Sequence, residues 1–304
     1  MKVKSAVLQT IGAQSPYKES MPLLIQELEL DPPGHEEILV EIKAAGLCHS
    51  DLSVINGSRP RPTPMALGHE AAGIVVKTGE GITDLQVGDH VVCIFVPACG
   101  HCPPCQEGRP ALCEEGARVN QDGTLLSGER RLHHDQDYIY HHLGVSAFST
   151  FAVTSRHSLV KIDPTIPFEI AALFGCAVMT GVGAVINTAH IKMGNSVAIV
   201  GLGGVGLSAL IGAVAAGAND IIAVDINPDK LAFAKELGAT HVFNSNDSDA
   251  VTQIKKVTGG GVEYAFETGG AVPAMQVAYN ITRRGGTTLQ PDSHIRNIYS
   301  RFRR

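Results

Sequence analysis

Residues 196–230 read SVAIVGLGGVGLSALIGAVAAGANDIIAVDINPDK, and this stretch decides the fold of the second half of the chain. It opens with an uninterrupted apolar run at residues 197–200, which is typical of a strand buried on both faces. A glycine-rich turn follows, and an apolar segment of helical length then extends to Ala216. A second apolar run, which ends at Asp225, comes next. The order strand, turn, helix, strand predicts a βαβ unit with parallel strands.

The turn in this unit carries a glycine pattern with a known physical use. Gly201, Gly203 and Gly206 fit G-x-G-x-x-G, and Gly204 lies within the same turn. Such glycines permit a tight turn, close approach of a pyrophosphate and packing of the helix on the strand, with the phosphates at the helix N-terminus. A glycine triplet alone would also fit a flexible turn. Between a strand and a helix it favours dinucleotide binding.

Asp225 ends the second strand at the distance expected of a ribose ligand, 19 positions after Gly206. A carboxylate there accepts hydrogen bonds from the ribose hydroxyls and repels a 2′-phosphate, which favours NAD over NADP. The alternative role, capping the next helix, suits Asn227 before Pro228 better. Lys230 is a second candidate for the ribose, and an exposed helix lysine is an equally good interpretation.

The two halves of the chain differ in their patterns. Beyond Asp225, strands at residues 241–244, 262–266 and 287–289 alternate with helices at 249–257 and 272–282, which continues the α/β pattern. Residues 2–163 instead contain short strand-like runs separated by Gly and Pro turns, which predicts a β-rich first domain. Within it, the polar residues 114–137 predict a solvated loop, and strand patterning returns at residues 145–153. The basic residues 291–304 lack an apolar period, and we expect a solvated end.

Residues 46–70, GLCHSDLSVINGSRPRPTPMALGHE, contain most of a candidate metal site. Pro60, Pro62 and Pro64 lie between Cys48 and His69, a density that no regular helix or central strand would tolerate, so a loop there can bring the thiol back to the imidazole. Asp51 would orient an imidazole through its second ring nitrogen, and Glu70 adds a carboxylate beside the candidate ligand. Singly, the cysteine and histidine would more often be structural. One further ligand is needed for a catalytic zinc.

Cys176 is the candidate for that missing ligand. It lies in ALFGCAVMTGVGAVINTAHIKMGNS, which we expect to be helical, just after the β-rich part of the chain. Alone, it would be interpreted as a core cysteine. Together with Cys48 and His69 it completes a Cys, His, Cys set with one coordination position left open.

Cys99, Cys102, Cys105 and Cys113, in PACGHCPPCQEGRPALC, give the most specific signal in the chain. Two-residue gaps let successive thiolates converge from one tight loop, and the fourth closes a tetrahedron. Disulfides and an iron–sulfur cluster are alternatives, but the spacing differs from that of common ferredoxins, and we favour a structural zinc. His101 inside the loop is interpreted as a bystander.

Composition narrows the function further. The chain has 304 residues, enough for two domains, and a formal charge of −6, which argues against nucleic acid or an anionic membrane as partner. No segment has the length and hydropathy of a signal peptide core or a membrane span. Seven cysteines, an odd number, favour metal binding in a reducing compartment over disulfides. We therefore expect a cytoplasmic protein.

With these motifs in place, the chain resembles the zinc-containing medium-chain alcohol dehydrogenases, a family that includes the class oxidising the glutathione adduct of formaldehyde. GLCHSD, GHE, the four-cysteine lobe, HHLGVSAFSTFAV, the Cys176 segment, GLGGVG and AVDINPDK occur in family order from about residue 3 to about residue 288. The resemblance implies an α/β chain with a GroES-like, β-rich, zinc-binding catalytic domain at residues 1–174. A Rossmann domain, a doubly wound parallel sheet, would occupy residues 175–304 and be incomplete at its C-terminus.

The resemblance also implies roles for individual residues. Cys48, His69 and Cys176 would hold a catalytic zinc, with Glu70 as an occasional ligand. Ser50 would accept the alcohol proton, and a primary alcohol or aldehyde would exchange a hydride with NAD. Thr180 and Val205 match positions that face the nicotinamide. A homodimer or tetramer is expected of the family.

Two departures from the family pattern leave alternatives open. Ser53 stands where many relatives have a histidine at the outer end of a proton relay. Relatives also continue for several dozen residues beyond position 304, so one alternative is a truncated, catalytically silent chain that binds zinc or NAD. A quinone reductase of the same fold is a weaker alternative, because those relatives generally lack the zinc ligands. The sequence does not identify the alcohol.

Overall fold

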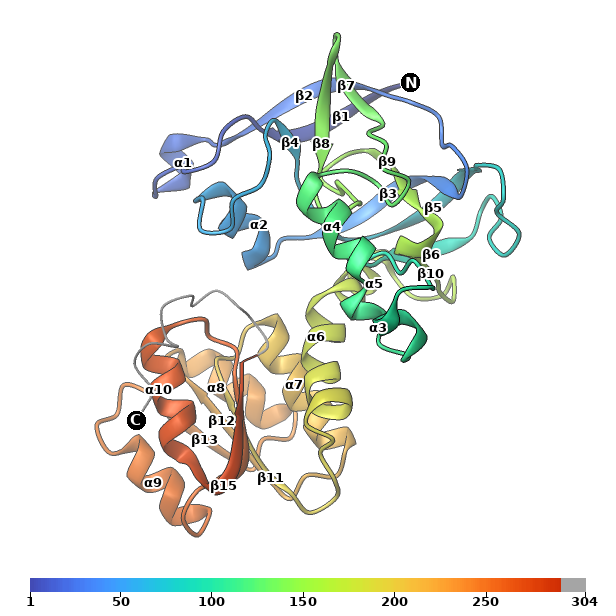
Figure 1. Cartoon of the computed structure of the whole chain (residues 1–304). Helices are drawn as coiled ribbons and strands as arrows, with labels where there is room; N and C mark the ends of the chain where they lie inside the picture. Colours follow the sequence, from blue (N-terminus) through green and yellow to red (C-terminus); the bar gives the residue numbers. More distant parts are fainter. Residues whose placement is uncertain (291–304) are drawn as a thin grey trace. The chain divides into compact units, whose positions relative to one another are not determined.

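The computed structural model describes residues 1–290, and the basic segment expected to be a solvated end lies outside them. The chain divides into two compact units, Met1–Cys176 and the part from Ala177 onward. Both are drawn in Figure 1. Each unit has its own sheet or sheets and its own apolar core, so each is described separately.

The first unit is β-rich, as its turn-punctuated sequence predicts. Strands β1, β2, β7, β8 and β4 form a closed barrel, and β10, β6, β5, β3 and β9 form a five-stranded sheet (Figure 1). Their bounds are β1 Lys2–Leu8, β2 Leu23–Leu30, β3 Glu37–Gly46, β4 Met65–Ala66, β5 Glu70–Thr78, β6 His90–Cys93, β7 Leu132–His134, β8 Asp137–His141, β9 Phe151–Ser155 and β10 Leu159–Lys161.

Helices in this unit are short and sit in the connections. They are α1 Tyr17–Ser20, α2 His49–Ile55, α3 Pro103–Gln106, α4 Glu114–Asp122 and α5 Phe168–Ala171, with 3-10 turns η1 Pro110–Leu112, η2 Arg156–Ser158 and η3 Ala172–Gly175. Closing the barrel removes two strand edges, and its interior is filled by side chains such as Leu28, Leu132 and Ile139.

Two expectations for the first unit are corrected. Residues 114–137 read as a polar loop, but Glu114–Asp122 is α-helical, because the Cys113 sulfur accepts the N–H of Gly116 and two glutamates occupy the first turn. Residues 145–153 read as strand, but β9 begins only at Phe151, because a turn with left-handed residues precedes it.

The second unit is a parallel sheet in the order β13, β12, β11, β14, β15, with helices on both faces (Figure 1). The elements are α6 Ala177–Gly183, the π-helical turn η4 Ala184–Thr188, β11 Ser196–Val200, α7 Gly204–Ala215, β12 Asp220–Asp225, α8 Pro228–Glu236, β13 His241–Asn244, α9 Ala250–Val257, β14 Val262–Glu267, α10 Val272–Ile281 and β15 Thr282–Leu289.

Successive residues of β11 enter different cores. Val197 and Ile199 pack in the cluster that includes α7 and α8, whereas Ala198 and Val200 pack in the cluster that includes α9 and α10. Burial of both faces explains why this strand is continuously apolar in the sequence. The expected βαβ pattern is confirmed as a doubly wound parallel sheet.

Within residues 1–290, no single helix is long and apolar enough to cross a membrane. The helical runs Phe168–Gly175 and Ala177–Thr188 reach the required length and hydropathy only when they are counted together.

Candidate functional site

Strand pairing brings Cys48 and His69 together. In the antiparallel pair of β3 and β5, Gly46 lies opposite Glu70, so the chain leaves β3 towards Cys48 at the point where it enters β5 from His69. The two strands are close here, since a Cβ at residue 46 would lie 2.4 Å from the Glu70 Oε2 atom and would displace that side chain. The proline-rich loop between the strands thus returns the chain to its starting point.

Cys176 comes to the same place from a distant segment. It was expected on a helix, but it lies at the break between η3 and α6, with φ −141° and ψ −71°. Gly175 passes so close to β6 that a Cβ there would meet the Cys93 carbonyl oxygen at 2.0 Å. Cys93 itself is fully buried in the sheet core, and burial raises the pKa of its thiol to about 12.

These segments form a cluster of four candidate ligands. The ligand atoms of Cys48, His69, Glu70 and Cys176 all lie within 4.8 Å of one another. Three of the four residues are buried, and Cys48 is half-buried. Two thiols and an imidazole are the ligand set of some catalytic zinc sites, so the donor set and its spacing fit zinc. Glu70 adds an oxygen donor at the same point.

Charges in the cluster are strongly coupled. A hydrogen bond from the Cys176 thiol, together with His69, lowers the pKa of Cys48 to about 3, and the resulting thiolate raises the pKa of Cys176. Burial would lower the pKa of His69, but its contacts with Asp51 and Cys48 raise it to about 10. Burial and the nearby Cys48 charge raise the pKa of Glu70 to about 7. The cluster therefore favours a positive charge at its centre.

Asp51 organises the cluster from behind. The Asp51 carboxylate is fully buried. Its Oδ1 atom accepts hydrogen bonds from the Gly68 N–H at 3.2 Å and from His69 Nδ1 at 3.3 Å. Oδ2 accepts the Cys48 N–H at 3.1 Å, so one carboxylate fixes both candidate ligands. Burial opposes the charge, but the nearby ring nitrogens of His142 and His69 hold the pKa of Asp51 well below its usual range. The second ring nitrogen of His69 is left for the metal.

His142 is a residue that sequence reasoning missed. Its Nδ1 lies 3.2 Å from the same Asp51 Oδ1 atom, and its ring packs edge-on against His69 at 5.4 Å between centroids. In the sequence it is the second of two adjacent histidines before Gly144, and nothing in that spacing connects it to Asp51.

The two serines near Cys48 have different settings. Ser50 is on the first turn of α2 and donates its backbone N–H to the Cys48 sulfur at 3.5 Å. Ser53 is buried, and its hydroxyl donates to the His49 carbonyl at 2.9 Å. A hydroxyl bonded within its own helix does not replace a solvent-facing relay base.

A second cluster is formed by Cys99, Cys102, Cys105 and Cys113, whose sulfurs all lie within 4.8 Å of one another. The Cys113 sulfur accepts backbone N–H groups from Cys99 at 3.2 Å and Gly116 at 3.3 Å. All seven cysteines are free thiols in this structure. Four converging sulfurs, held by backbone donors of one loop, fit a closed structural zinc site. His101 is exposed and bonds the Cys99 carbonyl instead.

The glycine turn of the second unit has the form of a phosphate cradle. Gly201 has φ +96°, and a Cβ there would lie 2.4 Å from the Gly269 nitrogen. A Cβ at Gly206 would lie 1.9 Å from the Gly201 carbonyl oxygen, so the absence of a side chain at residue 206 allows α7 to pack closely against the end of β11. In contrast, no protein atom lies within 4 Å of a Cβ built on Gly203. The first turn of α7 has no side-chain cap, so its N–H groups fit an anionic ligand such as a pyrophosphate.

The other expected cofactor residues lie around this turn. Asp225 ends β12 and accepts the Leu202 N–H through Oδ2 at 2.7 Å and the Asn227 N–H through Oδ1 at 2.9 Å. Lys230 is exposed on α8. A Cβ at Gly181 would meet the Val205 carbonyl oxygen at 2.3 Å, so α6 packs directly on the start of α7 beside Thr180.

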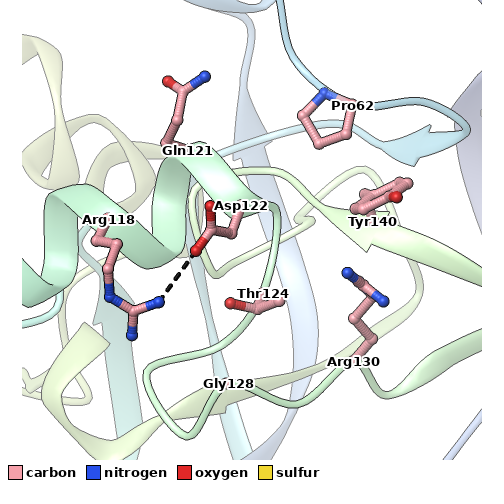
Figure 2. Close-up of a pocket in the computed structure, with 8 residues that line it drawn as sticks. All are labelled: Pro62, Arg118, Gln121, Asp122, Thr124, Gly128, Arg130 and Tyr140. Carbon is pink, nitrogen blue, oxygen red and sulfur yellow. Dashed lines mark hydrogen bonds and ion pairs between the residues drawn. The ribbon is translucent and has the colours of Figure 1, made fainter.

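A separate hollow of about 520 Å³ in the first unit is lined by none of the cluster residues (Figure 2). Arg118 on its wall is paired with Asp122 at 3.0 Å, and the Arg130 guanidinium lies 4.5 Å from the centre of the Tyr140 ring. It lacks the thiol and imidazole groups of the clusters above. Its lining residues are Pro62, Arg118, Gln121, Asp122, Thr124, Gly128, Arg130 and Tyr140.

Comparisons with known proteins identify the family of the chain. Residues 34–164 match the family model of the alcohol dehydrogenase GroES-like domain, and residues 204–290 match that of the zinc-binding dehydrogenases. An S-(hydroxymethyl)glutathione dehydrogenase from Synechocystis sp. is 41% identical over 288 residues, which cover 94% of this chain and 76% of the relative.

Solved structures of similar fold belong to the same family. An alcohol dehydrogenase zinc-binding domain protein from Burkholderia ambifaria has a TM-score of 0.87 and 37% identity, covering 95% of this chain and 76% of that one. A benzyl alcohol dehydrogenase from Acinetobacter calcoaceticus has a TM-score of 0.86 and 36% identity, with the same coverage. The expected GroES-like and Rossmann domains are thereby confirmed. With its ligand clusters and glycine turn, the chain belongs to the zinc-dependent alcohol dehydrogenases, oxidoreductases that use NAD(P).

Proposed function

We propose that this chain oxidises a primary alcohol, or reduces the corresponding aldehyde, with NAD as the hydride carrier. The observation that carries the proposal is the cluster of Cys48, His69, Glu70 and Cys176, with the buried Asp51 carboxylate behind the imidazole. Zinc bound there supplies a Lewis acid that makes an alcohol oxygen acidic near neutral pH. The four-cysteine cluster would bind a second, structural ion.

The chain's own residues would divide the remaining work. Cys48, His69 and Cys176 would hold the ion, and Asp51 would keep the His69 ring in its ligand orientation. The Ser50 hydroxyl, next to the ligand Cys48 on α2, would take the proton from the alcohol. Because the Ser53 hydroxyl is buried and bonded to its own helix, we propose that the proton leaves through water rather than through residue 53.

The same structure supports NAD over NADP as the cofactor. Asp225 lies at the end of β12, where the backbone N–H groups of Leu202 and Asn227 hold its carboxylate in place. A fixed negative charge at this position binds ribose hydroxyls and repels a 2′-phosphate. The N–H groups at the start of α7 would receive the pyrophosphate, and Thr180 and Val205 would face the nicotinamide. Lys230 would act as a secondary ribose contact.

The substrate class is inferred from chemistry and from relatives. The named relatives act on S-(hydroxymethyl)glutathione and on benzyl alcohol, and both compounds carry a primary CH₂OH group. We therefore propose a small primary alcohol as substrate. We further propose a cytoplasmic location, since crowded free thiols suit a reducing compartment.

The test uses the full chain loaded with zinc. NADH formation would be followed with NAD and benzyl alcohol, ethanol, or a formaldehyde–glutathione mixture, with Cys176→Ser as the matched control. We expect turnover of at least one alcohol by the wild type and none by the variant. Failure of every alcohol, in a protein shown to bind two zinc ions and NAD, would contradict the proposal and favour a silent binding protein.

A further inference from the structure

The turn after β8 places His142 against Asp51 and His69 of the candidate metal site. Three of its residues have left-handed backbone conformations: Leu143 at φ 52°, Gly144 at φ 66° and Ser146 at φ 54°. For residues with side chains this conformation costs about 1–3 kcal/mol each, and such strain is often found at functional sites. The turn is held because the N–H groups of Val145 and Ser146 both donate to the His142 carbonyl. His142 is thus fixed in the core, with 1% of its surface exposed.

His142 and His69 share one carboxylate oxygen. The Nδ1 atoms of the two rings lie 3.2 Å and 3.3 Å from Asp51 Oδ1. His69 makes an aligned hydrogen bond, whereas the His142 nitrogen lies off that direction and has no other partner among the described residues. The contact of His142 with Asp51 is therefore a close polar contact, at 3.2 Å, without hydrogen-bond alignment.

The two rings also contact each other. His69 packs edge-on against His142 at 5.4 Å and 87°, and against Phe95 at 5.8 Å and 85°. A ring held between two perpendicular neighbours, with one nitrogen bonded to Asp51, has a single orientation available. The free nitrogen of His69 is then directed to Cys48 and Cys176.

A purely structural role explains this arrangement less well. A buried imidazole nitrogen without an aligned partner costs free energy, and an apolar ring of similar size would fill the same space without that cost. The polar ring is therefore better explained by what it does to Asp51. A second ring nitrogen 3.2 Å from Oδ1 leaves a carboxylate that is completely removed from water less room to rotate.

We propose that His142 is a positioning residue for the metal site: by sharing Asp51 Oδ1 with His69, it fixes the carboxylate and through it the orientation of the ligand imidazole. The proposal rests on the zinc site proposed above. Groups that orient a histidine ligand from behind typically contribute 10–100-fold to metal affinity. We expect the contribution of His142 near the lower end, because Gly68 and Cys48 also hold the carboxylate.

Two substitutions separate the polar contact from the packing. His142→Phe keeps a ring of similar volume and removes the nitrogen. His142→Asn removes the ring, but its amide nitrogen can occupy nearly the same position as Nδ1. We expect His142→Phe to weaken metal binding by about tenfold and His142→Asn to restore most of it.

Metal affinity would be measured directly, by titrating the metal-free chain with Co²⁺ and Zn²⁺ against a competing chelator. The four-cysteine cluster is an internal reference in every variant, because it lies in a different loop. In His142→Phe, the Co²⁺ absorption of the Cys48–His69–Cys176 site should shift, and the affinity of the four-cysteine site should stay unchanged. Thermal unfolding of each metal-free variant controls for general loss of stability.

The outcomes distinguish this inference from the proposed function. A wild-type chain that binds metal only at the four cysteines would overturn both. Wild-type binding at both sites, with unchanged affinity in His142→Phe, would overturn the role of His142 alone. An Asn variant as weak as the Phe variant, or equal losses at both metal sites, would also refute it, since neither can come from the lost contact with Asp51.

Discussion

Replacing Gly203 by alanine should weaken NAD binding without destabilising the fold. The backbone at Gly203 has φ −82° and ψ −169°, which an alanine adopts without strain, and no protein atom lies within 4 Å of the added Cβ. Lower entropy of the unfolded chain would stabilise the variant by about 0.4–1 kcal/mol. Alanine is a poorer N-cap than glycine by a similar amount, so the two effects offset each other. The free energy of unfolding should change by less than about 1 kcal/mol.

The expected loss of NAD affinity has its cause in the open space around the Cβ of residue 203. The added methyl group would occupy the opening in front of α7, where a pyrophosphate approaches the backbone N–H groups. Displacing the phosphates from these donors should cost about 1.4 kcal/mol or more, which corresponds to at least about a tenfold rise in the Kd for NAD.

Gly206→Ala is the matched comparison in the same turn. Its Cβ would lie 1.9 Å from the Gly201 carbonyl oxygen and 2.7 Å from the Thr268 hydroxyl, so the start of α7 must move by about 1 Å. Overpacking of this kind costs about 1–3 kcal/mol. Calorimetric titration with NAD and urea unfolding should therefore separate the variants: Gly203→Ala loses affinity alone, and Gly206→Ala loses affinity and stability. Wild-type NAD affinity in Gly203→Ala would refute the assignment of the phosphate site.

Three further predictions concern the first unit. Burial, with Arg130 and Arg131 nearby, lowers the pKa of His141 to about 3, against 6.5 in the unfolded chain. The neutral His141 ring therefore contributes to stability above pH 6.5, and this contribution is lost as the pH falls. The free energy of unfolding should decrease by about 2 kcal/mol from about pH 7 to about pH 5. Urea unfolding of His141→Gln should not show this decrease. Arg131→Met leaves the Glu37 carboxylate, which is 1% exposed, without its ion pair. The free energy of unfolding in urea should fall by about 3 kcal/mol, and adding Glu37→Gln should restore part of it. Cys113→Ser should reduce bound zinc by one ion per chain in metal analysis and leave the other site loaded.

The parts of the site that the sequence predicts are those encoded in short spacings. The Gly201–Gly206 turn is confirmed as the link between a strand and a helix, because each glycine meets a local steric need. The four-cysteine set also lies within one loop, and the structure brings its sulfurs together. Local patterns of this kind determine local geometry, whatever the rest of the chain does.

What escaped prediction depends on contacts between distant segments. His142 contacts Asp51 only because the turn after β8 adopts left-handed backbone conformations, and the residue types in the turn do not predict them. Cys176 was expected within a helix, whereas it lies at a break beside β6. Helix α4 was missed because a cysteine, an unusual cap, starts it.

The same distinction separates the two metal clusters physically. The four-cysteine cluster is held by backbone donors of its own loop, so its geometry depends on little else. Cys48, His69 and Cys176 come from three separate segments, and the first two are joined by one buried carboxylate. Because Asp51 ties the N–H of one ligand to the ring of another, a change in its environment moves both at once. A perturbation at His142 or in the loop after β8 should therefore change the Cys48–His69–Cys176 cluster and leave the four-cysteine cluster unchanged.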